Sequence, residues 1–333
     1  MNAEFHYYSV YFLCLRAGLS EERCANIAFS SQYVDNAILA YDIDDDGFDY
    51  KTEVTQNYIF WDEATLRNIY LPFHFVPGEL DRARSERVDG AASRWTVTPD
   101  SPLAKEMLIA ALRSGDDFRI GIALHAYADT WAHQNFSGRT EACNVLDPAS
   151  PLPPAGHLQA LRAPDDASGK WLDPRLSGPR DAGGLTNVDN GARFREAARM
   201  IYRYLRTYLR TSFEDEGLHL DELSTAWVRY PGDLKARIAS FSVDLDVPPY
   251  EKRSYLAQAG IIDEEAEDSR FSSGYDTIAW AKAAIAHRTG LGSNGGRIAT
   301  HGRFRGSAIH RWNEAARAHR ELAAALLSKE GLL

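Results

Sequence analysis

The fold and the chemistry of this chain depend most on one stretch, Gly121-Ile-Ala-Leu-His125-Ala-Tyr-Ala-Asp129-Thr-Trp-Ala-His133-Gln-Asn-Phe136. Its two histidines and its aspartate are spaced four residues apart. Because an α-helix turns by about 100° per residue, each step of four drifts by only about 40°, so His125, Asp129 and His133 project from one side of a helix. An apolar core stripe does not normally place a carboxylate in its middle. The stripe therefore predicts a metal-binding helix.

Imidazole and carboxylate ligands together suit zinc, iron or manganese, and the carboxylate of Asp129 is able to bridge two ions. The structural alternative is that each histidine only satisfies a main-chain carbonyl or forms a surface pair with the aspartate. One helix cannot complete a coordination shell, so further ligands must come from elsewhere. The candidates are single ligand-type residues in apolar or aromatic surroundings: His6, Asp35, His74 and His157.

Periodic apolar residues and helix caps predict an all-α protein with long irregular loops, organised as a single domain over residues 1–333. Two stretches are not expected to form regular helices: residues 42–100, with two prolines around His74, and the proline-rich excursion at 137–190. The portion 191–333 is expected to be helical, with a glycine-rich basic loop at 288–306. The predicted helices cover 3–18, 20–41, 101–115, 116–136, 191–213, 275–287 and 307–328.

The central stripe resembles the metal helix of the zinc-dependent phospholipase C and single-strand-specific nuclease superfamily. Within that group, the catalytic domain of glycosylphosphatidylinositol phospholipase D has a similar His-x3-Asp-x3-His spacing. In the superfamily an aspartate and a histidine precede this helix and a histidine follows it, an order that Asp35, His74 and His157 match. The resemblance covers residues 1–160. It implies a helical bundle that holds two or three zinc ions, with iron or manganese as alternatives.

The chain departs from that superfamily at three points. The members other than glycosylphosphatidylinositol phospholipase D have a longer gap before the last histidine of the helix. The family's first ligand is the amino group of a processed chain, and here His6 is expected to replace it. The family's His-x3-Glu motif after the helix is also incomplete, because no glutamate occurs in the four residues after His157. Residues around His6 and His74, together with the central helix, are similar as well to a family of uncharacterised bacterial proteins.

The resemblance implies a metal-dependent hydrolase of phosphoesters, most of all phosphodiesters, with Asp35 and Asp129 as catalytic carboxylates. Asp165 is an alternative proton acceptor, and Arg162 is a candidate for stabilising developing charge. Two other interpretations remain open. One is a helical di-iron or dimanganese enzyme that acts on a non-phosphate substrate, although paired Glu-x-x-His motifs are missing. The other is a non-catalytic protein in which metal only holds long loops together.

The charge balance disfavours some partners. The net charge of −10 repels a duplex phosphate backbone, so we expect no binding to duplex nucleic acid. The three cysteines form no CxxC pair that would indicate a zinc knuckle or a redox site. No stretch reaches the roughly 18 apolar residues of a membrane helix, and no signal peptide is recognisable, which favours the cytoplasm.

One further pattern bears on metals. Asp42, Asp44, Asp46 and Glu53 match the ligand spacing of a calcium-binding EF-hand loop, including the glutamate at its twelfth position. The residue types at the eighth and ninth positions, Asp49 and Tyr50, do not fit, and no second loop of this kind is visible. The favoured interpretation is therefore a solvated acidic turn, with a single calcium site at 42–53 as the alternative.

Overall fold

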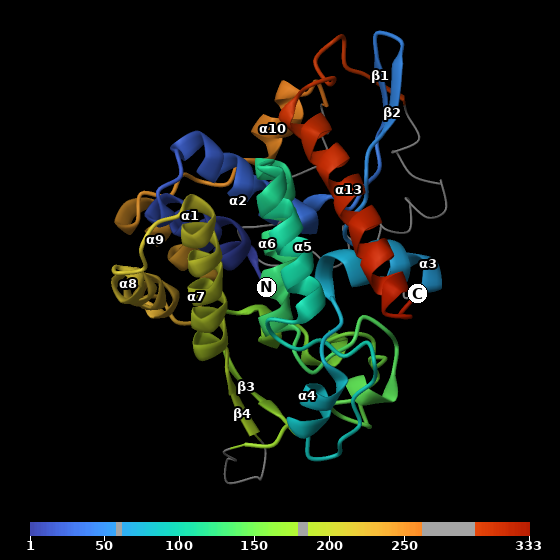
Figure 1. Cartoon of the computed structure of the whole chain (residues 1–333), viewed down its shortest axis with the longest axis vertical. Coiled ribbons are helices and arrows are strands. Elements are labelled where there is room, and N and C mark those ends of the chain that lie inside the picture. The colour runs from blue at the N-terminus through green and yellow to red at the C-terminus, as the bar shows by residue number, and fades with distance from the viewer. Residues whose placement is uncertain (58–61, 179–185, 262–296) are drawn as a thin grey trace.

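Helix α6 (Asp117–Ala132), which carries most of the stripe, lies in the middle of the molecule (Figure 1). The computed structural model describes residues 1–57, 62–178, 186–261 and 297–333. Four long helices surround α6 and contact it. They are α2 (Glu21–Asn36), α5 (Pro102–Ser114), α7 (Asn190–Leu209) and α13 (Ala308–Lys329).

Local capping explains where these helices begin. The Ser101 hydroxyl accepts a hydrogen bond from the Ala104 amide and starts α5, and Gly115 ends it in the left-handed conformation at φ 69°. The Asp116 carboxylate then accepts the amides of Phe118 and Arg119 at the start of α6. These boundaries agree with the sequence prediction. The end of α6 does not, because the helix stops four residues before the predicted end at 136.

Close packing of α2 against α6 positions the stripe. A Cβ atom at Gly121 would lie 2.2 Å from the Ile27 carbonyl oxygen and 2.5 Å from the Ser30 Cβ, so the two backbones approach more closely than a larger side chain would allow. This approach brings Asp35, near the end of α2, beside the histidines of α6. Glycine at 121 is therefore a packing requirement of the site.

Two segments that carry predicted ligands are π-helical. The expected helix at 3–18 divides into η1 (Glu4–Ser9), which holds His6, and α1 (Val10–Ala17). The second π-helix, η2 (Leu66–His74), ends at His74 and contains Pro72, which has no amide hydrogen to donate. The prolines thus prevent a regular α-helix, as expected, but the segment is still helical. π-Helical turns are rare in proteins, and those that do occur are often found at functional sites.

The prediction of an all-α protein was wrong, because two small sheets are present (Figure 1). Strand β1 (Asp42–Asp45) pairs antiparallel with β2 (Phe48–Lys51) and parallel with β5 (Arg297–Ala299). Strand β3 (Lys170–Asp173) pairs antiparallel with β4 (Thr186–Asp189). Each strand has three or four residues, too few for apolar alternation to reveal it in the sequence.

The remaining described elements are short or peripheral. The expected helix at 275–287 and residues 288–296 of the glycine-rich stretch lie outside the described residues. The excursion at 137–190 contains β3, β4 and three 3₁₀ turns, so it is less irregular than expected. The other elements are α3 (Glu63–Thr65), α4 (Leu80–Ser85), η3 (Ala142–Asn144), η4 (Leu158–Ala160), η5 (Ala163–Asp165), α8 (Glu216–Val228), α9 (Leu234–Asp244) and α10 (Lys252–Gln258).

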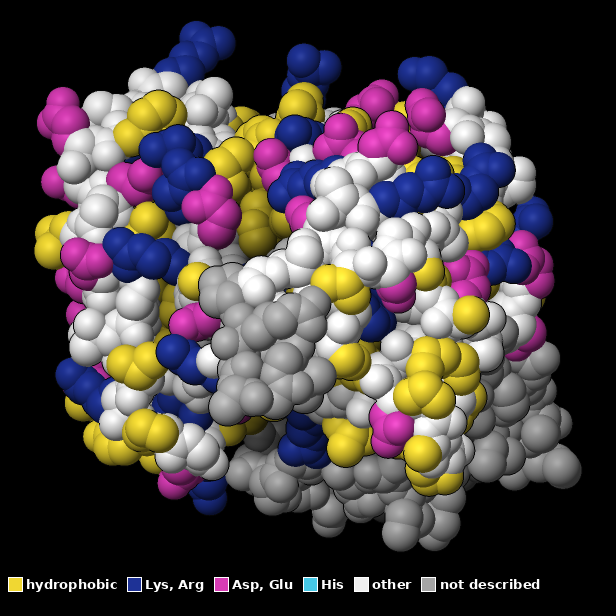
Figure 2. Space-filling view, turned by 90° about the horizontal axis from the view of Figure 1, so that it is seen from below, with side chains coloured by type: hydrophobic (Ala, Val, Ile, Leu, Met, Phe, Trp, Pro, Cys, Tyr) yellow, Lys and Arg dark blue, Asp and Glu magenta, His cyan; other side chains and the backbone are white. Residues whose placement is uncertain are grey.

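Among the described residues, no helix has both the length and the apolar character that crossing a bilayer requires. The face seen in Figure 2 carries interspersed acidic and basic side chains over its described part. A duplex-binding protein normally gathers its basic residues into a stripe or patch, and this face has mixed charge instead.

Candidate metal centre

The structure brings all seven predicted metal ligands into one cluster around Asp129. On one oxygen, His6 Nε2 lies 3.1 Å from Asp129 Oδ1. On the other oxygen, His74 Nδ1 lies 3.3 Å and His125 Nε2 lies 3.4 Å from Asp129 Oδ2. Asp35 Oδ1 faces the same two imidazoles at 3.9 and 3.7 Å. The carboxylate of Asp129 thus has different imidazoles at its two oxygens, as expected for a bridging ligand.

Three groups of side chains have the spacing that a metal ion needs, with the ligand atoms of each group all within 4.8 Å of one another. Two groups share His125, and the third lies at the C-terminal end of α6. The groups are His6, His125 and Asp129; Asp35, His74 and His125; and His133, His157 and Asp165.

Main-chain carbonyls determine which nitrogen each imidazole presents. His125 Nδ1 lies 2.8 Å from the Ser31 oxygen, and His74 Nε2 lies 2.8 Å from the Thr55 oxygen. A carbonyl only accepts, so the facing nitrogen carries the hydrogen and the other nitrogen of each neutral ring presents a lone pair to the cluster. Metal-ligating histidines in proteins are typically oriented in this way.

The same orientation recurs at the third group. His133 Nδ1 lies 2.8 Å from the His74 main-chain oxygen, and its Nε2 lies 3.2 Å from Asp165 Oδ1. His157 Nδ1 lies 2.9 Å from the Leu161 oxygen, and its Nε2 lies 3.7 Å from Asp165 Oδ2. Both rings therefore direct their second nitrogen at one carboxylate.

Acceptor atoms converge at the middle of the cluster. His74 Nδ1 and His125 Nε2 are 3.2 Å apart, and both are close to Asp129 Oδ2. With the other nitrogen of each ring bonded to a carbonyl, this arrangement puts two lone pairs and a carboxylate oxygen at one point. Such a set is repulsive unless a positive charge lies among its members. The donor set therefore fits a divalent cation with nitrogen and oxygen ligands.

The amino group of Met1 lies between the first and third groups. Its nitrogen is 2.5 Å from Asp129 Oδ1 and 3.2 Å from Asp165 Oδ1. The sequence prediction had His6 in place of a terminal amine, whereas the structure brings both His6 and the Met1 amine to Asp129. Burial lowers the pKa of this amine, but the negative charges of Asp129, Asp165 and Asp35 raise it overall to about 10.

The electrostatics of the cluster favour ionised carboxylates and a neutral His6. Burial alone would raise the pKa of Asp129, yet its neighbours His133, the Met1 amine and His125 hold that pKa well below its ordinary value. Burial and the neighbouring His125 lower the pKa of His6 to about 3. The His6 Nδ1 atom is buried and has no hydrogen-bond partner among the described residues. Ionised carboxylates and neutral imidazoles are the states that bind metal.

The cluster is buried at its centre and reaches solvent at two edges. The side chain of Asp129 is 1% exposed, whereas Asp35 is 15% and Asp165 is 19% exposed. The Asp35 carboxylate also accepts a hydrogen bond from Gln56 Nε2 at 3.3 Å. Asp35 and Asp165 are therefore the carboxylates of the cluster that solvent reaches.

Sequence reasoning underestimated Asp165, which was considered only as a proton acceptor. It stands at the end of η5 and shares the third group with His133 and His157. Its sequence signal was weak, since Asp165 and Asp166 occur together in a loop with no apolar periodicity. Arg162, expected to stabilise charge, precedes η5 as an exposed residue.

The alternative calcium loop has a different structure from an EF-hand. Asp42 and Asp44 lie in β1, Asp46 lies at the turn to β2, and the segment forms a hairpin rather than a loop between two helices. The Glu53 carboxylate is occupied by the guanidinium groups of Arg317 and Arg320. The twelfth-position ligand thus pairs with α13, and this geometry does not support calcium binding at 42–53.

Comparisons with known proteins place the chain in a family without indicating an activity. No curated protein matches the chain, and neither does any solved structure. One family model covers residues 1–327 and therefore nearly the whole length. The chain belongs to the family described as "Family of unknown function (DUF6765)".

Proposed function

We propose that this protein is a metal-dependent hydrolase of phosphoesters, with phosphodiesters as the first substrate class to test, and that it uses a di- or trinuclear His/Asp centre. Zinc suits the mixture of imidazole and carboxylate donors best, and iron or manganese suits it as well. Bound divalent ions supply local positive charge, which lets a chain of net charge −10 accept an anionic ester.

One observation carries the proposal. Four imidazoles, those of His74, His125, His133 and His157, each hold one nitrogen against a main-chain carbonyl and direct the other at a carboxylate of the cluster. A histidine that only satisfied a carbonyl would not need a second nitrogen aimed at shared acidic oxygens. Four such rings around Asp129 and Asp165 favour ligands over structural histidines.

The carboxylates of the site have different roles in the proposed hydrolysis, according to how exposed each one is. When bound, divalent ions lower the pKa of a water molecule and polarise a phosphoryl oxygen. Asp129, fully enclosed, holds the centre together. Asp35 is partly exposed and held by Gln56, so its carboxylate is placed to accept a proton at the solvent edge. Asp165 orients His133 and His157.

Elemental analysis followed by a substrate panel tests the proposal. The protein, purified without chelator or affinity metal, should contain more than one divalent ion per chain. It should hydrolyse bis(p-nitrophenyl) phosphate or p-nitrophenyl phosphate in preference to p-nitrophenyl acetate. The variant with both His125→Ala and Asp129→Ala should lose metal and activity together, because these residues serve two of the three groups.

His310→Ala is the matched control, because His310 lies on α13 outside the three groups. This variant should keep its metal content and its activity. Retention of all metal by the double variant would contradict the proposal. Metal binding without phosphoester hydrolysis would favour a structural metal, and hydrolysis of the acetate ester alone would favour a non-phosphate substrate.

A further inference from the structure

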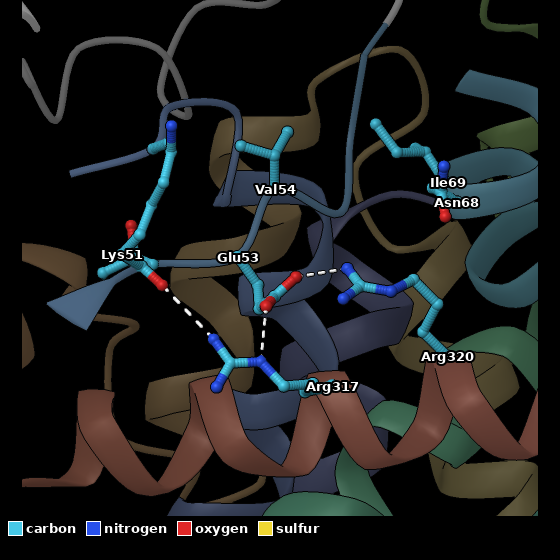
Figure 3. A pocket seen from close by; sticks show the side chains of 9 residues that line it. Lys51, Glu53, Val54, Asn68, Ile69, Arg317 and Arg320 are labelled. Atoms are coloured by element: carbon cyan, nitrogen blue, oxygen red, sulfur yellow. Dashed lines mark hydrogen bonds and ion pairs between the residues drawn. The ribbon is translucent and has the colours of Figure 1, made fainter. Parts of the chain in front are cut away.

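A separate cavity of about 320 Å³ lies between the segment after β2, the π-helix η2 and helix α13 (Figure 3). None of its lining residues belongs to the three metal groups. Figure 3 shows Arg317 and Arg320 rising from α13 toward Glu53, with Val54 and Ile69 at the other side of the hollow.

The charge of this cavity differs in sign from that of the whole chain. Its lining contains Lys51, Arg317 and Arg320 against the carboxylate of Glu53, which is three positive charges less one negative, or +2. Glu314, which pairs with Arg317 from outside the lining, reduces this charge to +1. The chain as a whole carries −10. Concentration of positive charge in a hollow of an acidic protein favours an anionic ligand.

Glu53 orients the arginines. Its carboxylate is 11% exposed, and Arg317 Nε lies 2.8 Å from Glu53 Oε1 while Arg320 pairs with the other oxygen. Arg317 is further held by the Lys51 main-chain oxygen and by Glu314. Side chains held in this way lose little freedom when a ligand binds, because their positions are already set.

Donors remain for a ligand at this cavity. Within the described part of the chain, Arg320 uses one terminal nitrogen for Glu53, which leaves its other N–H groups to bind an oxyanion. The Lys51 ammonium has no ion-pair or hydrogen-bond partner among the described residues. Figure 3 shows this exposed side chain extended away from the arginines, so it must turn toward Arg320 to contact the same ligand. A guanidinium and an ammonium together suit carboxylate or phosphate oxygens.

The opposite wall limits the ligand further. Ala40, Val54 and Ile69 contribute apolar surface, which an inorganic ion would leave uncovered. We infer that this cavity binds a small organic oxyanion, a carboxylate or phosphate head attached to a compact apolar group, through Lys51 and Arg320. This site does not depend on the proposed hydrolase activity.

Calorimetric titration of chelator-treated protein tests the inference, because phosphate binding at the metal centre is then removed. Phenyl phosphate and benzoate should each bind saturably at one site, and inorganic phosphate should bind more weakly. Lys51→Ala and Arg320→Ala should each weaken binding about tenfold or more, since each removes a charged hydrogen bond. Benzyl alcohol, which has the apolar group without the charge, should not bind.

Arg311→Ala is the matched control, because Arg311 lies on α13 and stacks on Phe118 away from the cavity. It should leave the affinity for phenyl phosphate unchanged. Lys51 is exposed at the end of β2, so its variant keeps the fold and tests the site even if removal of Arg320 disturbs Glu53. Absence of saturable binding, or equal affinity in the Lys51 and Arg311 variants, would overturn the inference.

Discussion

Arg237 and Glu4 form an ion pair enclosed in the protein, with Arg237 Nε 2.8 Å from Glu4 Oε1, although the two residues are 233 positions apart in the sequence. The same guanidinium donates from its second terminal nitrogen to Asp166 Oδ1 at 2.8 Å. Glu4 is two residues from His6, and Asp166 follows Asp165. One arginine of α9 thereby ties two ligand-bearing segments of the candidate metal centre together.

Arg237→Gln should lower the free energy of unfolding by roughly 3–5 kcal/mol, because it leaves the Glu4 carboxylate buried without its counter-charge. Urea denaturation measures the change. Arg195→Gln is the control, since Arg195 pairs with Asp221 at 2.7 Å on the surface and should cost less than about 1 kcal/mol. Equal effects of the two substitutions would show that the buried pair contributes no more than a surface pair.

Gly121→Ala should destabilise the protein by about 1–3 kcal/mol, since the added methyl group meets the Ile27 carbonyl and forces α2 away from α6. The same substitution at Gly217, in α8, meets no atom within 4 Å. Gly217→Ala should be neutral or stabilise by up to about 1 kcal/mol through helix propensity. Thermal denaturation measures the stability of both variants. A Gly121 variant as stable as the wild type would disprove the packing argument.

Asp165→Ala should remove about one ion per chain, because Asp165 is the only carboxylate of the His133 and His157 group among the described residues. Asp129→Ala should lower the metal content more, since Asp129 contacts imidazoles at both oxygens. Mass spectrometry of native protein counts the ions. Asp221→Ala, on the surface, should change nothing. Full metal content in the Asp165 variant would exclude the third group as a binding site.

His319 should make the protein less stable in acid. Its Nε2 lies 2.9 Å from the Pro72 main-chain oxygen, and burial lowers its pKa from 6.5 to about 4. The unfolded chain therefore binds a proton at a higher pH than the folded protein does. The neutral state of His319 therefore stabilises the folded protein above pH 6.5. As the pH falls toward 4, this stabilisation is lost and the free energy of unfolding decreases by roughly 3 kcal/mol.

Substitution by glutamine separates this effect from that of other histidines. His319→Gln retains a donor for the Pro72 oxygen but does not titrate, so its unfolding free energy should fall less between pH 6.5 and 4 than that of the wild type. Denaturation of chelator-treated samples at several pH values supplies the comparison. If the unfolding free energies of the two proteins fell in parallel with pH, His319 would not be the cause of the acid sensitivity.

Local sequence rules predicted where the central helices begin and that the stripe shares one helix face. Ser101, Gly115 and Asp116 act through hydrogen bonds and backbone conformations within a few residues of themselves, so the starts of α5 and α6 could be predicted. The i, i+4, i+8 spacing of His125, Asp129 and His133 puts them on one face of any helix that forms there. His6 and His74, singled out as lone histidines in aromatic surroundings, also lie in the cluster, and their role as metal ligands stays a prediction.

Contacts between distant segments decided the rest. The pairing of β1 with β5 joins Asp42 to Arg297, and strands of three or four residues have no periodicity of their own. Glu53 matches a calcium ligand by spacing, but α13 supplies two arginines that occupy it. The meeting of Asp165, the Met1 amine and Asp129 likewise depends on how η1 and η5 pack against α6. Residue spacing determines which side chains share a helix face, whereas the partners opposite that face depend on long-range packing, which short-range hydrogen bonding and periodicity do not encode.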